Sequence, residues 1–190
     1  MDVLSEVLRV VRLQGALFYN GEFSSPWSVY AAGSRALARY FETETEHVVV
    51  YHLLTEGRAS VRLESGEYLS LQAGDIVMIP HGDRHVVENG PATCTINDEE
   101  HLVDVLSQGL KRWRVGGGGE ITRFVCGYMA CDPRLGHVIL GGLPQLFKIN
   151  MRTHPSGAWL ENSIRFFIDQ EDTIQPGREA VLAKLSEVLF

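Results

Sequence analysis

The segment GDIVMIPHGDRHVVEN, residues 74–89, constrains the fold of this chain more than any other stretch. Its apolar run is typical of a buried strand and ends at Pro80, which has no backbone N–H to offer a sheet. Gly82 then permits a tight turn, and His85 begins a second apolar run. The segment therefore predicts two strands joined by a short turn. The turn would carry a histidine into a barrel, where it either binds a metal or simply packs.

Short apolar runs broken by Gly, Pro, Ser and Asp continue on both sides of this segment, as in LFYNGEF, WSVYAAG, HVVVYHLL and ITRFVCGYMA. This rhythm is typical of an antiparallel sandwich or barrel and not of βαβ units. The stretch ASVRLESGEYLSL predicts a hairpin that turns at Ser65-Gly66. Residues 90–120 predict a long, mobile excursion from the barrel, with a helix near residues 101–110. Within it, the basic cluster at residues 111–114 is interpreted as a solvated loop and the glycines at 116–119 as flexible filler.

Helical spacing of apolar residues is found at both ends of the chain. Residues 2–13 predict a short N-terminal helix, and the pattern after residue 133 is helical throughout, with two apolar faces in the tail. We therefore expect a β-barrel domain over residues 1–150 and a helical hairpin over residues 151–190. The last helix is still apolar at Phe190 and has no capping signal. This favours either a longer protein cut at this point or a helix completed by a partner chain, and a naturally free-standing chain is the alternative.

The composition narrows the class of protein. The chain has 190 residues, of which 45% are hydrophobic and 22% charged, which suits one globular domain with a real core. Its net charge of −7 argues against nucleic-acid binding by this chain alone. Three cysteines are too few for a disulfide framework and favour a reducing cytoplasm. The sequence has no run of 18 apolar residues, so a membrane span is not expected. It also has no nucleophile elbow, zinc-protease motif or phosphate-binding loop.

Gly74, Pro80, Gly82, His85 and Asn89 fit the pattern G-x5-P-x-G-x2-H-x3-N at every fixed position. The segment thereby resembles the second motif of the cupin superfamily, which implies a mainly β fold, a small jelly-roll barrel. In metal-binding cupins a first motif supplies two histidines and a glutamate. The stretch HLLTEGRASVRL resembles the end of that motif, but the ligand positions fall near residues 41, 43 and 50, which are Phe, Thr and Val. The missing ligands argue against a typical cupin dioxygenase or isomerase.

A different set of ligands remains available inside the barrel. His52 lies two residues beyond Val50 and therefore faces the same side of its strand. Together with His85 and Cys126 it would suit a tetrahedral zinc ion, or another divalent transition metal, with His81 as the candidate fourth ligand. The alternative for His52 and His85 is a hydrogen-bonded core residue, for His81 a solvent-facing position at the barrel mouth, and for Cys126 a small buried hydrophobe. The pocket of the barrel is expected to be lined by Val50, His52, Leu54, His85 and Cys126.

Most of the chain further resembles the N-terminal cupin-type effector domain of AraC-like bacterial transcription regulators. The resemblance is carried by residues 2–31, by YHLLTEGRASVRLESGEYLSLQAGDIVMIPHGDRHVV, by TRFVCGYMACD and HVILGGLPQLFKI, and by the helical tail. It implies a sensor that binds a small-molecule effector, forms a homodimer and couples the signal through the hairpin. DNA would be bound only through a domain missing from this chain. The alternatives are a free-standing, metal-dependent cupin enzyme acting on a small organic substrate, and a storage or scaffold barrel without a ligand.

Overall fold

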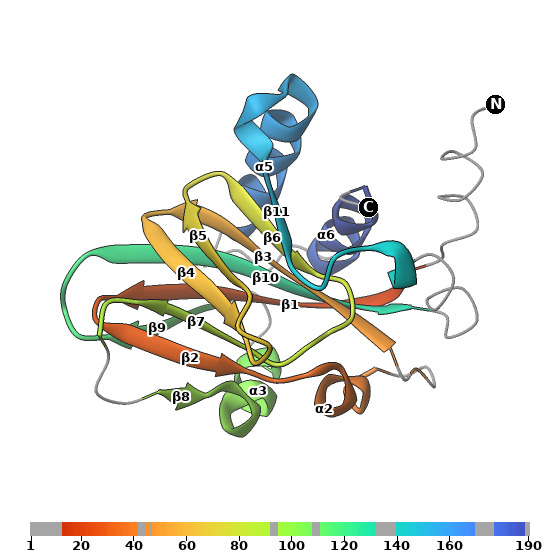
Figure 1. The fold of residues 1–190 in the computed structure, drawn as a ribbon. Coiled ribbons are helices and arrows are strands. Elements are labelled where there is room, and N and C mark those ends of the chain that lie inside the picture. Colours follow the sequence, from red (N-terminus) through yellow and green to blue (C-terminus); the bar gives the residue numbers. More distant parts are fainter. Residues whose placement is uncertain are drawn as a thin grey trace.

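The computed structural model describes residues 13–41, 45, 47–91, 95–107, 111–131, 140–169 and 177–188. Two β-sheets face each other, and two C-terminal helices pack on the outer side of the larger sheet (Figure 1). The larger sheet has the strand order β11-β6-β3-β10-β1-β9, and the smaller has the order β5-β4-β7-β2-β8. The predicted mainly β, jelly-roll class is confirmed. The helix expected over residues 2–13 lies outside the described residues except for Leu13, which begins a strand.

The elements have the following bounds. The strands of the larger sheet are β1 (Leu13–Ser24), β3 (His47–Glu56), β6 (Asp75–Ile79), β9 (Arg112–Gly116), β10 (Ile121–Cys131) and β11 (Phe147–Asn150). Those of the smaller sheet are β2 (Trp27–Ala31), β4 (Arg58–Leu63), β5 (Tyr68–Gln72), β7 (His85–Asn89) and β8 (Ile96–Asn97). The helices are α2 (Ser34–Ala38), α3 (Asp98–Ser107), α5 (Pro155–Ile168) and α6 (Arg178–Glu187), with 3-10 turns η1 (Leu140–Gly142) and η2 (Met151–Thr153).

Strand β3 lies at the centre of the larger sheet and is buried on both faces, which explains its unbroken apolar run. Val50 and Leu54 belong to the core between the two sheets, whereas Tyr51 and Leu53 belong to the core beneath the helices. Because side chains alternate along a strand, His52 lies on the inner face with Val50 and Leu54. The predicted orientation of His52 is therefore confirmed.

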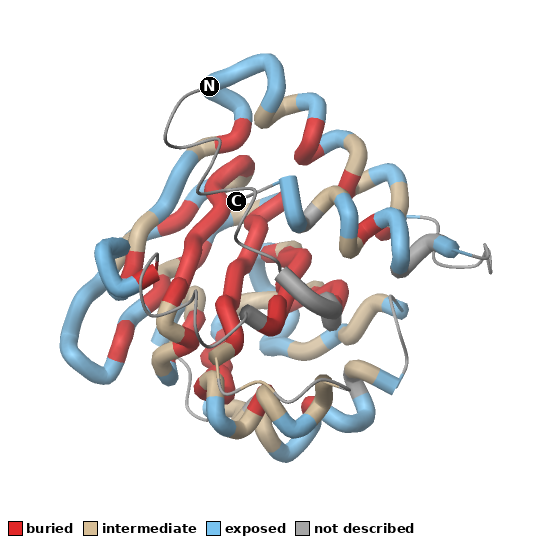
Figure 2. Tube along the Cα trace, turned by 90° about the vertical axis from the view of Figure 1, so that its right-hand side faces the viewer, coloured by how far each residue is buried: buried red, intermediate tan, exposed pale blue. Residues whose placement is uncertain are grey.

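The helical hairpin closes the outer face of the larger sheet. Leu160, Ile164 and Ile168 of α5 and Leu182 of α6 are buried against that face. Each such side chain contributes about 1.5–3 kcal/mol by leaving water. Figure 2 shows the buried residues gathered in the central strands, with exposed residues on the outward sides of the helices. The hairpin predicted within residues 151–190 is thus formed by α5 and α6, while the connection at residues 170–176 lies outside the described residues.

The turn between β6 and β7 has the form that its sequence predicts. β6 ends at Ile79 and β7 begins at His85. Gly82 has a φ of 63°, and a Cβ there would lie 2.3 Å from the carbonyl oxygen of Val48. Its own carbonyl accepts a hydrogen bond from the backbone N–H of Ser34 at 2.7 Å. Only glycine fits this position, so the turn fixes where His85 enters the barrel.

The hairpin predicted between residues 59 and 71 is confirmed. β4 and β5 pair antiparallel, with Val61 opposite Leu69, and the turn includes Gly66 at a φ of 97°. The burial of β4 alternates strictly, because its inner face meets the core and its outer face meets solvent.

Residues 90–120 are more regular than their composition suggests, and the prediction of a loop at the basic cluster is wrong. The segment contributes β8 and β9, which pair in parallel with β2 and β1, and the helix α3 between them. The glycine run is an ordered turn: the N–H groups of Gly117 and Gly119 donate to the carbonyls of Ser24 and Ser25. A Cβ on Gly116 would lie 2.1 Å from the Ser24 carbonyl oxygen, so close backbone contact explains the glycines.

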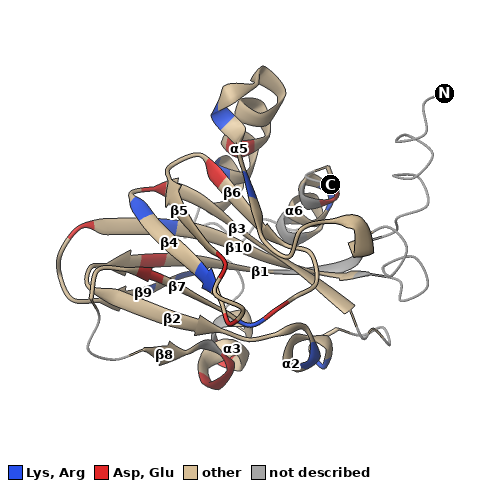
Figure 3. Cartoon of the chain, in the orientation of Figure 1, with Lys and Arg blue, Asp and Glu red and all other residues tan. Residues whose placement is uncertain are grey.

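The basic cluster is held by acidic partners. Arg112, Arg114 and Arg123 lie 3.4, 3.3 and 2.8 Å from the carboxylate of Glu22. Burial alone would raise the pKa of Glu22, but the hydrogen bond from Arg123 and the charges of the three arginines lower it overall. Acidic and basic residues are interspersed along the strands and helices (Figure 3). The cluster is therefore part of a mixed ion-pair network and not a free basic surface.

A second correction concerns the segment after residue 133, which the pattern predicts to be entirely helical. Residues 147–150 form β11, which pairs antiparallel with β6 at the edge of the larger sheet. Lys148 of this strand reaches across to the carboxylate of Asp75 at 2.9 Å. Among the residues that the structure describes, no helix is both long and apolar enough to cross a membrane.

Candidate functional site

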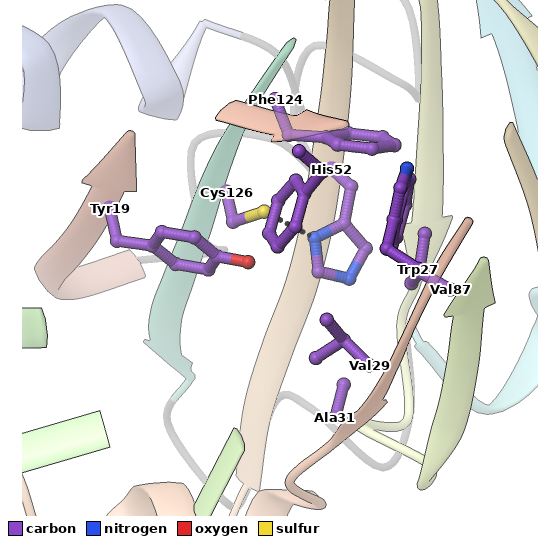
Figure 4. A pocket seen from close by; sticks show the side chains of 9 residues that line it. Tyr19, Trp27, Val29, Ala31, His52, Val87, Phe124 and Cys126 are labelled. Carbon is purple, nitrogen blue, oxygen red and sulfur yellow. Dashed lines mark hydrogen bonds between the residues drawn. The ribbon is translucent and has the colours of Figure 1, made fainter. Parts of the chain in front are cut away.

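A small cavity of about 10 Å³, room for about one water molecule, lies between the two sheets. It is lined by Tyr19, Phe23, Trp27, Val29, Ala31, His52, Val87, Phe124 and Cys126 (Figure 4). These residues come from β1, β2, β3, β7 and β10, so both sheets contribute to the lining. The lining is mainly aromatic and aliphatic and includes no carboxylate, lysine or arginine. The cavity can therefore hold an uncharged molecule but offers no partner for a buried charge.

Three buried polar side chains form a chain of hydrogen bonds beside the cavity. His52 and Cys126 are directly opposite each other in the β3–β10 ladder, and His52 Nδ1 lies 2.7 Å from Cys126 Sγ. The other nitrogen of the ring, His52 Nε2, lies 2.7 Å from His85 Nε2. His85 Nδ1 in turn lies 2.8 Å from the backbone carbonyl oxygen of Asp83. The structure thus brings together the three residues predicted from separate motifs.

The carbonyl of Asp83 determines the direction of each hydrogen bond in this chain of three polar side chains. A carbonyl oxygen only accepts, so His85 donates from Nδ1. With both rings neutral, His85 Nε2 accepts from His52 Nε2–H, and His52 Nδ1 accepts from the thiol of Cys126. Each polar atom of the chain therefore has a partner, as buried polar groups require.

Burial keeps both imidazoles uncharged. His52 and His85 are 3% and 0% exposed. Burial lowers the pKa of His52 well below its ordinary 6.5, and the neighbouring His85 lowers it further. Burial also lowers the pKa of His85 to about 4, against an opposing effect of its hydrogen bond to Asp83. At neutral pH the site is consequently polar but carries no charge on these rings.

The donor atoms of the three residues do not converge on one point. The two nitrogens of His52 face different partners, so a single ion cannot bind His52, His85 and Cys126 together while the ring lies this way. Over the described parts of the chain, no group of three or more His, Cys, Asp or Glu side chains is placed to hold a metal ion. The arrangement fits a hydrogen-bonded chain better than a zinc cage. Zinc binding stays a prediction.

His81, the predicted fourth ligand, has other partners. Its Nε2 lies 3.2 Å from the carbonyl oxygen of Leu143, and its ring faces that of His47 at 6.3 Å between centroids. His47 in turn bonds the carbonyl of Pro80. The structure therefore does not bring His81 to the cavity.

The predicted lining is only partly the observed one. His52 and Cys126 line the cavity, whereas Val50 and Leu54 lie in the same inner core away from it, and His85 stands behind His52. The sequence reasoning missed the aromatic and small residues of β1 and β2. A usable signal was present: Trp27, Val29 and Ala31 alternate in WSVYA, as the inward face of a strand requires.

An aromatic cluster extends from the cavity to the edge of the larger sheet. Phe23 stacks on Trp27 with centroids 4.5 Å apart. Trp113 of β9 meets the edges of Tyr19 and Phe23 at 6.0 and 5.6 Å. Two of the rings that line the cavity thus also contact the edge strand β9.

The outward faces of the same two strands hold the end of α5. Asn20, next to the cavity-lining tyrosine in β1, donates to the carbonyl of Ile168 at 3.5 Å. Arg112 of β9 lies 3.2 Å from the carboxylate of Asp169, which caps α5. Because neighbouring residues of a strand face opposite sides, β1 and β9 contact the cavity on one face and the helical hairpin on the other.

Comparisons with known proteins agree with this architecture. A family model described as Cupin matches residues 2–190. The HTH-type transcriptional regulator AlkR of Acinetobacter baylyi is 24% identical over 198 residues, which include 100% of this chain and 59% of AlkR. The RCS-specific HTH-type transcriptional activator RclR of Escherichia coli is 25% identical over 195 residues, with 100% of this chain and 54% of RclR covered. The chain thus spans little more than half the length of these relatives.

Among solved structures, apo ToxT from Vibrio cholerae is similar with a TM-score of 0.46 and 10% identity, over 93% of this chain and 55% of that one. The match of the whole chain to two regulators confirms its resemblance to the cupin-type domain of AraC-like regulators. Both curated relatives are named as regulators of transcription.

Proposed function

Since the chain belongs to the cupin family, with relatives that are regulators, we propose that it is the effector-sensing part of a transcription regulator. The observation that carries the proposal is the small cavity between the sheets, which has a polar chain on one side and an aromatic cluster on the other. DNA binding would be the task of a helix-turn-helix segment outside this chain. Such a regulator would work in the cytoplasm.

The route from cavity to hairpin supports this proposal. An effector larger than a water molecule would displace Tyr19 or Phe23, and both rings contact β9. β1 and β9 hold the C-terminal end of α5. A ligand shifts such an arrangement only if it binds one state more tightly than the other. Displacement of the inner rings provides that difference.

A binding screen tests the proposal. A panel of small organic molecules is added to the purified chain and the unfolding midpoint is measured. We expect an effector to raise the midpoint, by about 2.7 kcal/mol of added stability at a hundredfold excess over its Kd. Ala31→Val and Ala31→Leu fill the cavity and should abolish this rise. Ala59→Val, also at a buried position (9% exposed, against 3% for Ala31) but away from the cavity, should keep it. A rise that survives both Ala31 variants contradicts the site.

Homodimerisation is a second part of the proposal, and the exposed face of α5 supports it. Trp159 and Phe166 are 61% and 60% exposed and lie seven residues apart, on one side of the helix. Large exposed apolar side chains that share a face are typical of an interface. Sedimentation velocity should show a dimer that Trp159→Glu dissociates. Tyr68→Glu, at a site 56% exposed on β5, is the matched control and should leave the dimer intact.

Zinc is the finer prediction that still needs a test. Binding by all three residues would require the ring of His52 to turn, because its nitrogens now face different partners. Elemental analysis of the purified chain decides the matter. Near-stoichiometric metal that is lost in His52→Ala, His85→Ala and Cys126→Ala supports the prediction. Metal at only a small fraction of an equivalent in the unmodified chain rejects it.

A further inference from the structure

We infer that the cavity takes a small, uncharged organic molecule with one hydrogen-bond acceptor, which would bind the indole N–H of Trp27. This inference rests on the proposed function and adds the chemical class of the effector. It concerns the chain without a bound metal ion.

The first step is the absence of charge around the cavity. Among the described residues that line it there is no carboxylate, lysine or arginine, and the ring of His52 is neutral. Glu22, which precedes the lining residue Phe23, is occupied by three arginines on the outward side of β1. An anionic or cationic effector would lose its hydration without gaining a counter-charge, which is strongly unfavourable. A neutral molecule avoids this penalty.

The second step is the use of the polar groups already present. The thiol of Cys126, the Nε2–H of His52 and the Nδ1–H of His85 all donate within their own chain. That chain therefore has no N–H or S–H left to bind an effector while it stays intact. A donor for the effector must come from another lining residue.

The third step identifies this donor. Trp27 lines the cavity and is 3% exposed, and its Nε1 has no hydrogen-bond partner among the described residues. Buried donors are normally satisfied by protein or by a bound molecule, so the indole N–H is the group that an acceptor atom inside the cavity would meet. The indole nitrogen lies at the end of the cavity where Phe124 is found (Figure 4). Because the other walls are rings and aliphatic groups, the remainder of the effector should be apolar.

Acetone and acetate form a matched pair of probes, since they share size and planar shape but differ in charge. Each is titrated at millimolar concentrations into the ¹⁵N-labelled chain, and the three indole N–H resonances are followed. Trp27→Phe and Trp159→Phe assign the signals. We expect acetone to move the Trp27 signal with a midpoint at least about tenfold lower than that of acetate. The signal of Trp159, which is exposed, is the internal control.

Trp27→Phe keeps an aromatic ring but removes the donor. In this variant acetone should bind several-fold more weakly, as reported by the unfolding midpoint, with an unchanged circular dichroism spectrum showing that the fold is kept. Should that variant unfold, Ala31→Val serves instead, because filling the cavity should remove the acetone shift while Trp27 is retained.

Three outcomes overturn the inference: acetate binds as tightly as acetone, acetone shifts Trp159 as much as Trp27, or neither probe moves Trp27, so that the cavity holds water only. These outcomes can be separated from failure of the proposed function. If the Ala31 variants still abolish the response to a molecule found in the binding screen, only the chemical class is wrong. If they leave that response intact, the sensing site itself is wrong.

Discussion

The two faces of the larger sheet are equally buried but chemically different. Beneath the helices, the outer face packs mainly aliphatic, aromatic and methionine side chains from β3, β6, β10 and the hairpin, and the buried polar residues Asn20 and Glu161 bond Ile168 and Arg152. Between the sheets, the inner face includes His52 and Cys126, meets His85 and leaves a cavity. A hydrogen-bonded polar group contributes little net stability and the atoms around a cavity lose packing contacts, so the inner face should contribute less stability than the outer face. The contrast teaches that the outer face contributes most to holding the fold together, while the inner face has the features of the ligand site proposed above.

The largest expected effect is on the outer face. Ile164→Ala removes a side chain that is 1% exposed and should lower the free energy of unfolding by about 4 kcal/mol. Phe166→Ala, two residues along α5 and 60% exposed, should change it by no more than about 0.5 kcal/mol in a dilute, monomeric sample. Urea unfolding measures both. Equal losses would mean that the hairpin is not held by its buried face.

The second-largest effect is expected from acid, which should lower the free energy of unfolding through the histidines of the inner face. The unfolded chain binds protons on His52 and His85 below about pH 6.5, whereas in the folded chain burial lowers the pKa of His52 well below that value and the pKa of His85 to about 4. Stability therefore falls as the pH is lowered from 6.5, by about 1.4 kcal/mol per pH unit for each histidine. Urea unfolding at pH 7 and pH 5 should show a drop that His52→Leu/His85→Leu reduces by roughly 2 kcal/mol per ring. A drop of the same size in that variant would contradict neutral, buried rings.

A smaller change in the free energy of unfolding is expected from variants of the polar chain at neutral pH. His85→Leu alone leaves His52 Nε2–H without an acceptor and should destabilise the chain by about 1–3 kcal/mol. Replacing all three residues of the polar chain, as in His52→Leu/His85→Leu/Cys126→Ala, should leave the free energy of unfolding within about 1 kcal/mol of that of the unmodified protein. Chemical unfolding at pH 7 checks both variants. If the triple variant is less stable than His85→Leu, the polar chain stabilises the fold. That result would contradict the contrast drawn between the two faces.

The smallest effect lies where the two faces are connected. Asp169→Asn removes the exposed ion pair with Arg112 and should lower stability by at most about 0.5 kcal/mol. Hydrogen exchange at the last turn of α5 should nevertheless become faster, because that end loses one of its two anchors on the barrel. Unchanged exchange there would exclude Arg112 as a link between barrel and hairpin.

The sequence predicted those parts of the molecule that local chemistry determines. The Pro80–Gly82 turn, the β4–β5 hairpin and the inward face of β3 follow from steric limits and strand alternation, and all three are found. The parallel pairing of β9 with β1 was not predictable, because it joins Asn20 to Arg112 across a gap in sequence that no local pattern records. The glycine run misled for the same reason. Glycine permits flexibility, but here it permits backbone contact that only the folded chain reveals.

The candidate site was predictable in its members but not in its chemistry. Motif and alternation brought His52, His85 and Cys126 to one place, and the structure places His52 within hydrogen-bond distance of each of the other two. Which nitrogen faces which partner depends on ring rotation, and no residue spacing encodes that angle. The rotation decides between a cage and a chain of hydrogen bonds.

The burial of β3 on both faces has a mechanical consequence. A strand bonded to β6 and β10 at its sides and covered above and below cannot slide or tilt without breaking contacts in every direction. The central strands of the sheet should therefore be rigid, and movement should be confined to its edge strands. Within the described chain β9 is bonded only to β1, so the margin beside the aromatic cluster is where the barrel can give way at the smallest cost. A movement that couples the cavity to the helices would therefore involve the edge strand β9 and not the central strand β3.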